Sequence, residues 1–516
     1  MDRPYTRTHV ATADQASRVD AAAISAGIPS RALMRVAGCH AATIIRERYA
    51  DRLASGVTVY TGSGNNGGDG WVVAGALARA GVTVHVCEVI GAASPDAVAE
   101  RNEVRDLVAE GEPSGSGVIV DAILGTGSRG LLRDPVVSAV QRINAHRASG
   151  AAIVALDLPT GVDATSGIGA EQGVPLHVTP DLTVAFGTCK QGHLLARDAC
   201  GDVVIVDIGL RAQWTEALPQ LVDQAWVAKS IPPIPFDAHK GTRKKLAIVA
   251  GGAGMGGAVL LAIHGALRSG IGMTKVITDP SNIESVRTRF PEALTETLPL
   301  ADEALHALNA WCDVALIGPG LPATPDTRAL IERFLKVVEV PVVLDAGALT
   351  AFAGDYGALS SAIGRRAAIL TPHPLEYARL KGLDVADVLA RRFDVGLDVA
   401  QSNVTLLLKG APTIVTGPFF RRFVSAAGSA ALGTAGSGDT LGGIVATLLA
   451  QIGDAPSAAA AGAWVHGRAA ELCRTIRGVT LDDIVAQLPA VWEELRTVAA
   501  SPYPVLAELK REWNDA

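Results

Sequence analysis

The sequence predicts an α/β protein of two domains, each built on a mostly parallel sheet with helices on both faces. Short apolar strands alternate with helical segments in both halves of the chain, which is the pattern of such sheets. At 516 residues the chain is too long for a single core. Residues 212–237 contain four prolines, which disfavour a continuous helix or a central strand. We therefore expect a first domain over 1–215, a linker over 216–237 and a second domain over 238–516.

Elements of the first half are assigned from runs of β-branched residues, which favour strands, and from mixed polar and apolar segments, which favour helices. Two helices are expected within residues 13–50. The elements that follow are a strand at 57–61, a helix at 69–80, a strand at 82–87, a helix at 95–110, a strand at 118–121, a helix at 135–147, and strands at 152–157, 182–186 and 202–206.

The second half begins a new alternating unit after the prolines. Its expected elements are strands at 245–250, 273–277, 313–318, 341–345, 367–370 and 404–409, and helices at 258–269, 440–449 and 457–473. A turn at 251–257 precedes the first of these helices, and 371–376 is expected to be a loop and a helix start. Residues from about 480 onward are expected to form a helical tail.

Composition favours a globular enzyme of the cytoplasm. Hydrophobic residues make up 49% and charged residues 19%, and the net charge of −7 without a long basic run argues against a nucleic-acid partner. The polar N-terminus has no signal-like apolar core, and no uncharged run resembles a membrane span. The six cysteines form neither a C-x-x-C pair nor a metal-like cluster, which suits reduced thiols.

Residues 433–443 form a small-residue loop that runs directly into an apolar helix. Free N–H groups and the positive dipole end at such a helix start favour an anion, and glycines let a phosphate approach the backbone. Asp439 stands at this point, where it could take or hold a proton. The alternative is that Asp439 only caps the helix.

A second glycine-rich loop, at 62–70, follows the first expected strand. Ligands of parallel sheets bind beyond the carboxyl ends of the strands. Six polar residues of the first half fall at such ends: Asn65, Asn66, Asp69, Asp121, Asp157 and Thr160. One chain is therefore expected to carry two phosphate-handling sites.

These motifs resemble a known fused enzyme. Segments of the first half resemble the NAD(P)H-hydrate epimerase domain: 64–70, 121–127 and 157–161. Segments of the second half resemble the ADP-dependent NAD(P)H-hydrate dehydratase: 318–321, 370–376, 408–411 and 436–439. The resemblance implies a Rossmann-like three-layer αβα domain followed by a ribokinase-like α/β domain, and it covers roughly residues 10 to 500.

The reactions that the resemblance implies are the repair of hydrated NADH and NADPH. The first domain would interconvert the R and S hydrates. The second would dehydrate the S form, with ADP converted to AMP and phosphate, because phosphorylation turns the hydroxyl into a leaving group. Asp439 would deprotonate the attacking hydroxyl, and the N–H groups of the loop would stabilise the transferred phosphoryl group. Mg²⁺ is expected with the nucleotide, held mainly by phosphates and water.

Contacts in the second domain follow from the resemblance. Those implied for the nucleotide are Lys409, Gly410, Ala411, Pro412, Thr413, Ala435, Gly436, Ser437 and Gly438. Those implied for the hydrate are Ala258, Gly320, His373 and Asp439. For His373 the alternative is a loop histidine held between prolines, and for Lys409 a surface lysine at a strand end.

Contacts in the first domain are implied in the same way. Those for the hydrate are Asn65, Asn66, Gly67, Gly68, Asp69, Gly125, Thr126, Gly127, Ser128, Arg129, Gly130, Leu131 and Asp157. Asn66, Asp121 and Thr160 match the ligands of a K⁺ ion, to which they offer hard oxygen atoms. Epimerisation needs an acid–base group, for which we expect Asp157 with Lys190 assisting. The alternatives are a turn-forming Asp157 and a solvated Lys190.

The sequence departs from the family pattern at two positions. The family serine of Asp-x-Pro-Ser-Gly is Thr160, which keeps a hydroxyl. The usual Asp-Ala-Asp of the dehydratase is Asp345-Ala-Gly347, so the second acid is missing. This loss puts a role for that position in doubt, but neither change removes an expected catalytic residue.

Two other functions stay open at this point. The loop at Asp439 would serve a kinase of a small hydroxylated vitamin precursor equally well, and the first domain could be a non-catalytic binding module. The family suggests a homo-oligomer. The sequence decides neither the oligomer interface nor the preference for NADH or NADPH hydrate, nor whether the two sites exchange substrate.

Overall fold

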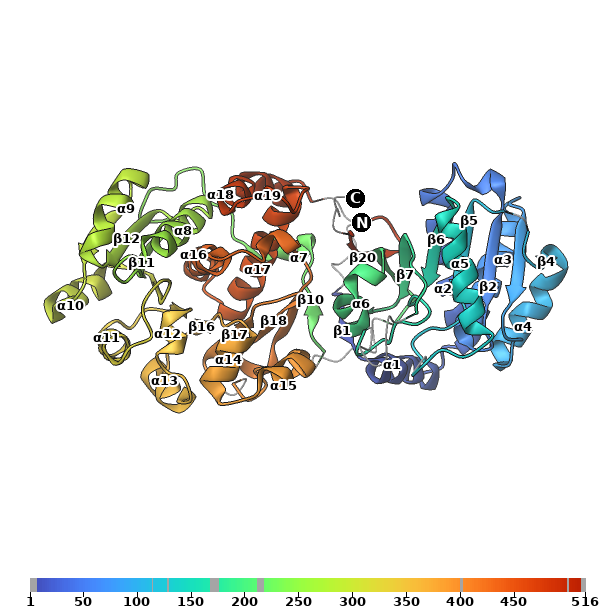
Figure 1. The fold of residues 1–516 in the computed structure, drawn as a ribbon, viewed down its shortest axis with the longest axis horizontal. Coiled ribbons are helices and arrows are strands. Elements are labelled where there is room, and N and C mark those ends of the chain that lie inside the picture. The colour runs from blue at the N-terminus through green and yellow to red at the C-terminus, as the bar shows by residue number, and fades with distance from the viewer. Residues whose placement is uncertain are drawn as a thin grey trace. The chain divides into compact units, whose positions relative to one another are not determined.

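The computed structural model describes residues 7–113, 115–127, 130–167, 176–210, 218–399, 402–498 and 501–511. The chain divides into two compact units (Figure 1). One unit comprises the described residues up to 218 together with 501–511, and the other comprises 219–498. Both units alternate strands with helices, which confirms the predicted α/β class.

The first unit contains an eight-stranded sheet in the order β20-β9-β7-β6-β5-β2-β3-β4, parallel except for the β20–β9 pair. Its strands are β2 (Val57–Thr61), β3 (Val84–Glu88), β4 (Ala109–Glu110), β5 (Val118–Ala122), β6 (Ala152–Leu156), β7 (Leu182–Phe186), β9 (Asp202–Val206) and β20 (Val505–Leu509). A separate small sheet pairs β1 (Val10–Ala11) with β8 (Cys189–Lys190).

Helices cover both faces of this sheet. The helices of the unit are α1 (Ala13–Ser25), α2 (Ser30–Arg48), α3 (Asn65–Arg79), α4 (Pro95–Val104), α5 (Val136–Ala148) and α6 (Gln191–Leu195). Alternate strand residues point to opposite faces. Accordingly Val118 and Val120 of β5 pack with α2 and α3, whereas Ile119 packs with α5. The result is the expected three-layer αβα arrangement.

The second unit contains a ten-stranded sheet in the order β10-β19-β18-β17-β16-β15-β14-β11-β12-β13, parallel from β13 to β17. Its strands are β10 (Gln220–Leu221), β11 (Lys245–Val249), β12 (Met273–Thr278), β13 (Leu294–Thr297), β14 (Val314–Ile317), β15 (Val342–Leu344), β16 (Ala368–Leu370), β17 (Val404–Leu408), β18 (Thr413–Thr416) and β19 (Arg422–Ser425). The pairs β17–β18 and β18–β19 are antiparallel.

The central helix of the second unit is α16 (Ser437–Ile452), which packs between α8 (Gly256–Arg268) and α17 (Ala455–Leu472). A Cβ added at Gly443 would lie 2.1 Å from the carbonyl oxygen of Ala262, so glycine permits this close crossing. The other helices are α7 (Gln224–Ser230), α9 (Ile283–Arg289), α10 (Asp302–Trp311), α11 (Pro325–Val337), α12 (Gly347–Thr350), α13 (Tyr356–Ile363), α14 (Pro374–Lys381), α15 (Val385–Ala390), α18 (Leu481–Ala486) and α19 (Leu488–Arg496).

Several element predictions are wrong in detail. Helix α3 begins at Asn65 rather than Asp69, because the glycine-rich loop itself forms the first turn after Gly64. The helix expected to reach residue 110 ends at Val104 and is followed by β4. The expected linker contains β10 and α7, which belong to the second unit. The expected helical tail ends in β20, which adds to the sheet of the first unit.

Within the described residues, no helix combines the length and the apolar character needed to cross a bilayer.

Candidate functional site

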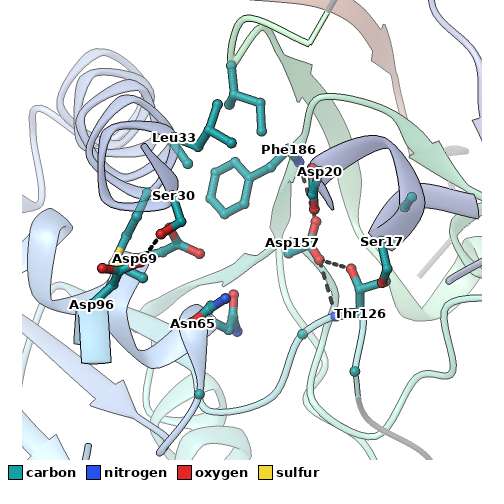
Figure 2. Close-up of a pocket in the computed structure, with 18 of the residues that line it drawn as sticks. Ser17, Asp20, Ser30, Leu33, Asn65, Asp69, Asp96, Thr126, Asp157 and Phe186 are labelled. Carbon is teal, nitrogen blue, oxygen red and sulfur yellow. Dashed lines mark hydrogen bonds between the residues drawn. The ribbon is translucent and has the colours of Figure 1, made fainter. Parts of the chain in front are cut away.

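A cavity of about 510 Å³ opens in the first unit beside the carboxyl ends of its strands. Figure 2 shows side chains from α1, α2, α3 and the strand ends converging on it. Eight of the predicted residues line this cavity: Asn65, Asn66, Asp69, Gly125, Thr126, Gly127, Asp157 and Lys190. The structure therefore brings together segments that lie more than 100 residues apart in the chain.

Asp157 is the most fully bonded side chain of the cavity. Its Oδ1 accepts a hydrogen bond of 2.5 Å from Lys190 Nζ, and its Oδ2 accepts from the N–H and the hydroxyl of Thr126. Its backbone has φ of 62°, a strained value for a non-glycine residue and one that is common at functional sites. Burial acts to raise the pKa of Asp157, but the ammonium of Lys190 and these hydrogen bonds outweigh it and lower the pKa.

Two further carboxyls share the cavity and keep their protons more readily. Burial, together with the charge of Asp157, raises the pKa of Asp69 well above its usual value. Burial also raises the pKa of Asp20 on α1 to about 6, with Lys190 opposing the shift and Asp157 adding to it. The cavity therefore combines a carboxyl whose pKa is lowered, Asp157, with two carboxyls whose pKa is raised, Asp20 and Asp69.

Two of the three residues predicted to hold K⁺ are bonded to each other. Asp121 is fully buried and accepts hydrogen bonds of 2.7 Å from the Thr160 hydroxyl and 2.8 Å from the Thr160 N–H. Burial raises the pKa of Asp121 to about 6, against these hydrogen bonds. Among the described residues, the buried side-chain oxygen and nitrogen of Asn66 have no hydrogen-bond partner, which leaves its carboxamide available to a ligand. A Cβ on Gly125 would come within 3.3 Å of that oxygen.

Some predicted contacts of the first domain lie elsewhere. Gly67 and Gly68 are buried in α3, where an added Cβ would lie 2.0 Å from the Gly62 carbonyl oxygen and 2.5 Å from the Met34 side chain, respectively. The lack of a side chain at Gly67 and Gly68 therefore allows α3 to pack closely against its neighbours. Gly130 and the exposed Leu131 are not among the lining residues. Ser128 and Arg129 lie outside the described residues.

The sequence prediction missed part of the cavity wall. Asp20 and Ser17 come from α1, Leu33 from α2, Asp96 from α4 and Phe186 from the end of β7. Asp20 had one detectable signal, because it stands four residues after the buried Ala16, at the border of the apolar stripe of α1. The local sequence does not show what such an acid faces, because this depends on how α1 packs in the fold.

The predicted anion loop of the second unit lies at the start of α16. Gly436 takes the left-handed conformation with φ of 91°, and Ser437 begins the helix. The Ser437 N–H donates to the Thr434 carbonyl oxygen at 3.2 Å, which corrects its prediction as a free donor. Within the described chain, the N–H groups of Ala435, Gly436 and Gly438 have no such partner, so they are available to an anion.

Asp439 lies in the first turn of α16 beside a partly buried ion pair. Lys409 Nζ is 2.9 Å from Asp345 Oδ1 and 3.7 Å from Glu376 Oε2. Burial raises the pKa of Asp439 to about 7, with Asp345 and Glu376 adding to the shift and Lys409 opposing it. A base with that pKa is half ionised near neutral pH, where it can both accept and release a proton.

The ion pair also fixes the positions of the Lys409 and Asp345 side chains. A Cβ added at Gly438 would lie 3.1 Å from Lys409 Nζ, so the ammonium lies against the start of α16. Asp345 is 1% exposed and holds the ammonium there. Lys409 is thus no surface lysine, and Asp345, the first acid of the family pattern and the one that this sequence keeps, is its direct partner.

Gly347 has a steric reason to replace the acid of the family pattern. It begins α12, and an added Cβ would lie 2.1 Å from the Leu321 carbonyl oxygen. Any side chain at this position would require the backbone to shift.

The loop after β17 carries the remaining nucleotide contacts that were predicted. Arg392 donates from Nη1 to the Ala411 carbonyl oxygen at 2.8 Å, and the Thr413 hydroxyl donates to the Gly410 carbonyl oxygen at 2.9 Å. A Cβ on Gly410 would lie 2.3 Å from the guanidinium of Arg392. Pro412 belongs to the same loop, which Arg392 therefore holds in shape.

Ala258, Gly320 and His373 are the remaining predicted hydrate contacts of the second domain. Gly320 adjoins Ala258, since a Cβ on Gly320 would be 2.8 Å from the Ala258 Cβ. His373 is the N-cap of α14, and its Nδ1 accepts from the Glu376 N–H at 3.2 Å. Glu376 in turn approaches Lys409, so this cap adjoins the ion pair.

The described part of the chain has no group of three or more His, Cys, Asp or Glu residues arranged to hold a metal ion.

Parallel sheets with a glycine-rich helix start and an adjacent acid in each unit define a two-site α/β enzyme for phosphate-bearing ligands. Known proteins give the same class. The family described as YjeF-related protein N-terminus matches residues 30–192, and the family described as NAD(P)H-hydrate dehydratase matches residues 246–489.

Curated relatives match over nearly the whole chain. A bifunctional NAD(P)H-hydrate repair enzyme of Moorella thermoacetica is 32% identical, with 92% of this chain and 95% of that protein covered. The corresponding Escherichia coli enzyme is 33% identical, with 90% of each chain covered. The chain therefore belongs to the family of bifunctional NAD(P)H-hydrate repair enzymes, as its motifs predicted.

A solved structure also resembles part of this chain. It is the ADP/ATP-dependent NAD(P)H-hydrate dehydratase of Bacillus subtilis, co-crystallised with ATP and Mg²⁺. Its identity is 28%, its TM-score is 0.46, and the match covers 53% of this chain and 97% of that one.

Proposed function

We propose that this protein repairs hydrated NADH and NADPH in two steps, one in each unit. The first unit equilibrates the R and S hydrates. The second dehydrates the S hydrate, with ADP converted to AMP and phosphate. The observation that carries the proposal is the pair of dissimilar acid sites in one chain, Asp157 bound by Lys190 and Asp439 at an anion-binding helix start.

Dehydration begins at Asp439. The hydrate hydroxyl loses its proton to Asp439 as its oxygen attacks the β-phosphorus of ADP, and the bond to AMP breaks. The N–H groups of Ala435, Gly436 and Gly438 stabilise charge on the transferred group, and Lys409 adds a nearby positive charge. Phosphate then leaves carbon C6 with the bonding electrons, and loss of a proton from C5 restores the double bond.

Mg²⁺ is the cation we propose for the nucleotide, where it would neutralise phosphate charge. Asp345 is committed to Lys409 at 2.9 Å, which fits a metal held by the phosphates and water rather than by a carboxylate cluster.

Epimerisation is assigned to Asp157, with Lys190 as its partner. Loss of the C6 hydroxyl leaves a cationic nicotinamide ring, which the ionised Asp157 stabilises, and water can then return to either face. We propose that Asn66, Asp121 and Thr160 hold K⁺, because the unpartnered carboxamide of Asn66 and the neighbouring oxygens suit such an ion. The ion would supply positive charge for the phosphates of the hydrate.

The kinase alternative is less favoured, because the family to which the chain belongs acts on NAD(P)H hydrates and the cavity of the first unit would have no role. We propose the cytoplasm as the compartment, since all six cysteines are unpaired. A homo-oligomer stays a prediction.

The test is recovery of absorbance at the reduced-nicotinamide band. The substrate is a mixture of R and S NADH hydrates, supplied with ADP, Mg²⁺ and K⁺. We expect full recovery that requires ADP. Recovery that stops once the S form is consumed would contradict the epimerase assignment. A stable phosphorylated product would favour the kinase.

A further inference from the structure

Asp20 is a carboxyl of the first cavity to which no role has been given. It lies on α1, whose start is fixed by Thr12 and Gln15 in a capping box and by the hydrogen bond of 3.0 Å from the Ala13 N–H to the Thr165 hydroxyl. The buried side of α1 packs on the protein, and Asp20 faces the cavity (Figure 2). The helix therefore holds Asp20 in place independently of the glycine-rich loop.

The groups that face Asp20 come from three other elements. They are Asp69 on α3, Asp157 after β6 and Lys190 on β8. The one cation, Lys190, is bonded to Asp157 at 2.5 Å and to the Phe186 carbonyl oxygen at 2.9 Å. Among the described residues Asp20 has no ion-pair or hydrogen-bond partner. Its carboxyl is thus free to bond a ligand, unlike that of Asp157.

This difference bears on the chemistry, and the argument rests on the proposed epimerase function. Asp157 is held ionised by Lys190 and by the two hydrogen bonds of Thr126, so it suits charge stabilisation better than proton transfer. Reversible loss of a hydroxyl also requires an acid that protonates the leaving oxygen. Two carboxyls in different environments commonly divide such roles.

We propose that Asp20 is a second catalytic residue of the epimerase site, the acid–base group that serves the C6 hydroxyl while Asp157 stabilises the ring cation. The C6–O bond breaks with its electrons on oxygen, and that oxygen takes the proton of Asp20 and leaves as water. The ring nitrogen supplies the electron pair that forms the C=N⁺ bond. Water then adds to the other face of C6 and returns its proton to Asp20, so that no co-reactant is consumed.

The raised pKa of Asp20 agrees with a role as an acid–base group. Burial, with Asp157 adding and Lys190 opposing, raises the pKa of Asp20 to about 6. About one tenth of Asp20 is therefore protonated at pH 7, and this fraction grows towards pH 6 and declines as the pH rises. The epimerisation rate should fall on the alkaline side of that pKa.

The test compares Asp20→Asn with Asp14→Asn in the full-length protein. Asp14 stands on the same helix but outside the cavity lining. Each variant is assayed for conversion of R to S hydrate and, separately, for ADP-dependent dehydration of S hydrate, which reports on intact folding of the other unit. Thermal unfolding of the first unit is followed in parallel.

We expect Asp20→Asn to lower the kcat of epimerisation about 10²-fold, to change the KM little and to lose the alkaline limb of the pH profile. Asp14→Asn should match wild type in both activities and in the pH profile, and Asp20→Glu should regain part of the rate.

An Asp20→Asn protein with the wild-type kcat and pH profile would overturn this inference but not the epimerase function. The same holds if the alkaline limb of the pH profile is lost in Asp69→Asn and kept in Asp20→Asn. A wild-type protein that dehydrates S hydrate but never converts R hydrate would overturn the epimerase function, and this inference with it.

Discussion

Asp157 in the first unit and Asp439 in the second are both enclosed acids with a lysine nearby, yet their surroundings favour opposite protonation states. Lys190 bonds Asp157 directly at 2.5 Å and lowers its pKa. In the second unit Lys409 bonds Asp345 instead, and the pKa of Asp439 rises to about 7. The choice of partner for the lysine therefore separates a fixed negative charge from a base that can take up a proton.

The largest effect should come from removing the base. Asp439→Asn keeps the size of the side chain but accepts no proton, so ADP-dependent dehydration of S hydrate should fall about 10³-fold. Epimerisation should be unchanged, since Asp439 belongs to the other unit. Initial rates of both reactions on separated hydrates measure this. Dehydration at the wild-type rate would remove Asp439 from the mechanism.

The next largest effect should come from removing Lys190, the cation that keeps Asp157 ionised. Lys190→Met leaves Asp157 buried without its cation, so we expect epimerisation to fall about 10²-fold and unfolding of the first unit to become easier by about 3 kcal/mol. Denaturant unfolding and the R-to-S rate give the two values. The double variant Lys190→Met with Asp157→Asn removes the unpaired charge. It should regain stability but not activity, and a double variant as unstable as the single one would argue against the pair.

A smaller effect concerns pH. Asp439 must be ionised to act as a base, and its pKa is raised to about 7. Dehydration should therefore be fully active above this pH and fall about tenfold per pH unit below it. Epimerisation should not share this acid limb, because the pKa of Asp157 is lowered. Profiles of the two rates on one preparation test this, and identical acid limbs would contradict it.

The smallest effect concerns stability alone. A chain ending at residue 498 loses β20, whose residues pair with Val203, Val204, Ile205 and Val206 of β9. We expect this truncation to destabilise the first unit by about 2 kcal/mol and to leave dehydration intact. Hydrogen exchange of the β9 amides measures it. Unchanged protection there would mean that β20 contributes nothing to that edge.

The sequence predicted most features that depend on local signals. Strand β2 and the acid after β6 were found because β-branched runs and strand-end acids are local patterns. Strand β20 was missed, since its partner β9 lies about 300 residues earlier and an edge strand carries a weak apolar pattern. Asp20 was missed for the same kind of reason, because only the packing of α1 brings it to the cavity.

If the two units hold two independent sites, a variant that lacks one site should be complemented by a variant that lacks the other. Asp157→Asn and Asp439→Asn proteins are each given mixed R and S NADH hydrates with ADP, Mg²⁺ and K⁺. The first should stop once the S form is consumed, and the second should restore no absorbance. An equal mixture should restore the signal completely, because each variant supplies the site that the other lacks. A mixture that stops where Asp157→Asn alone stops would contradict the account.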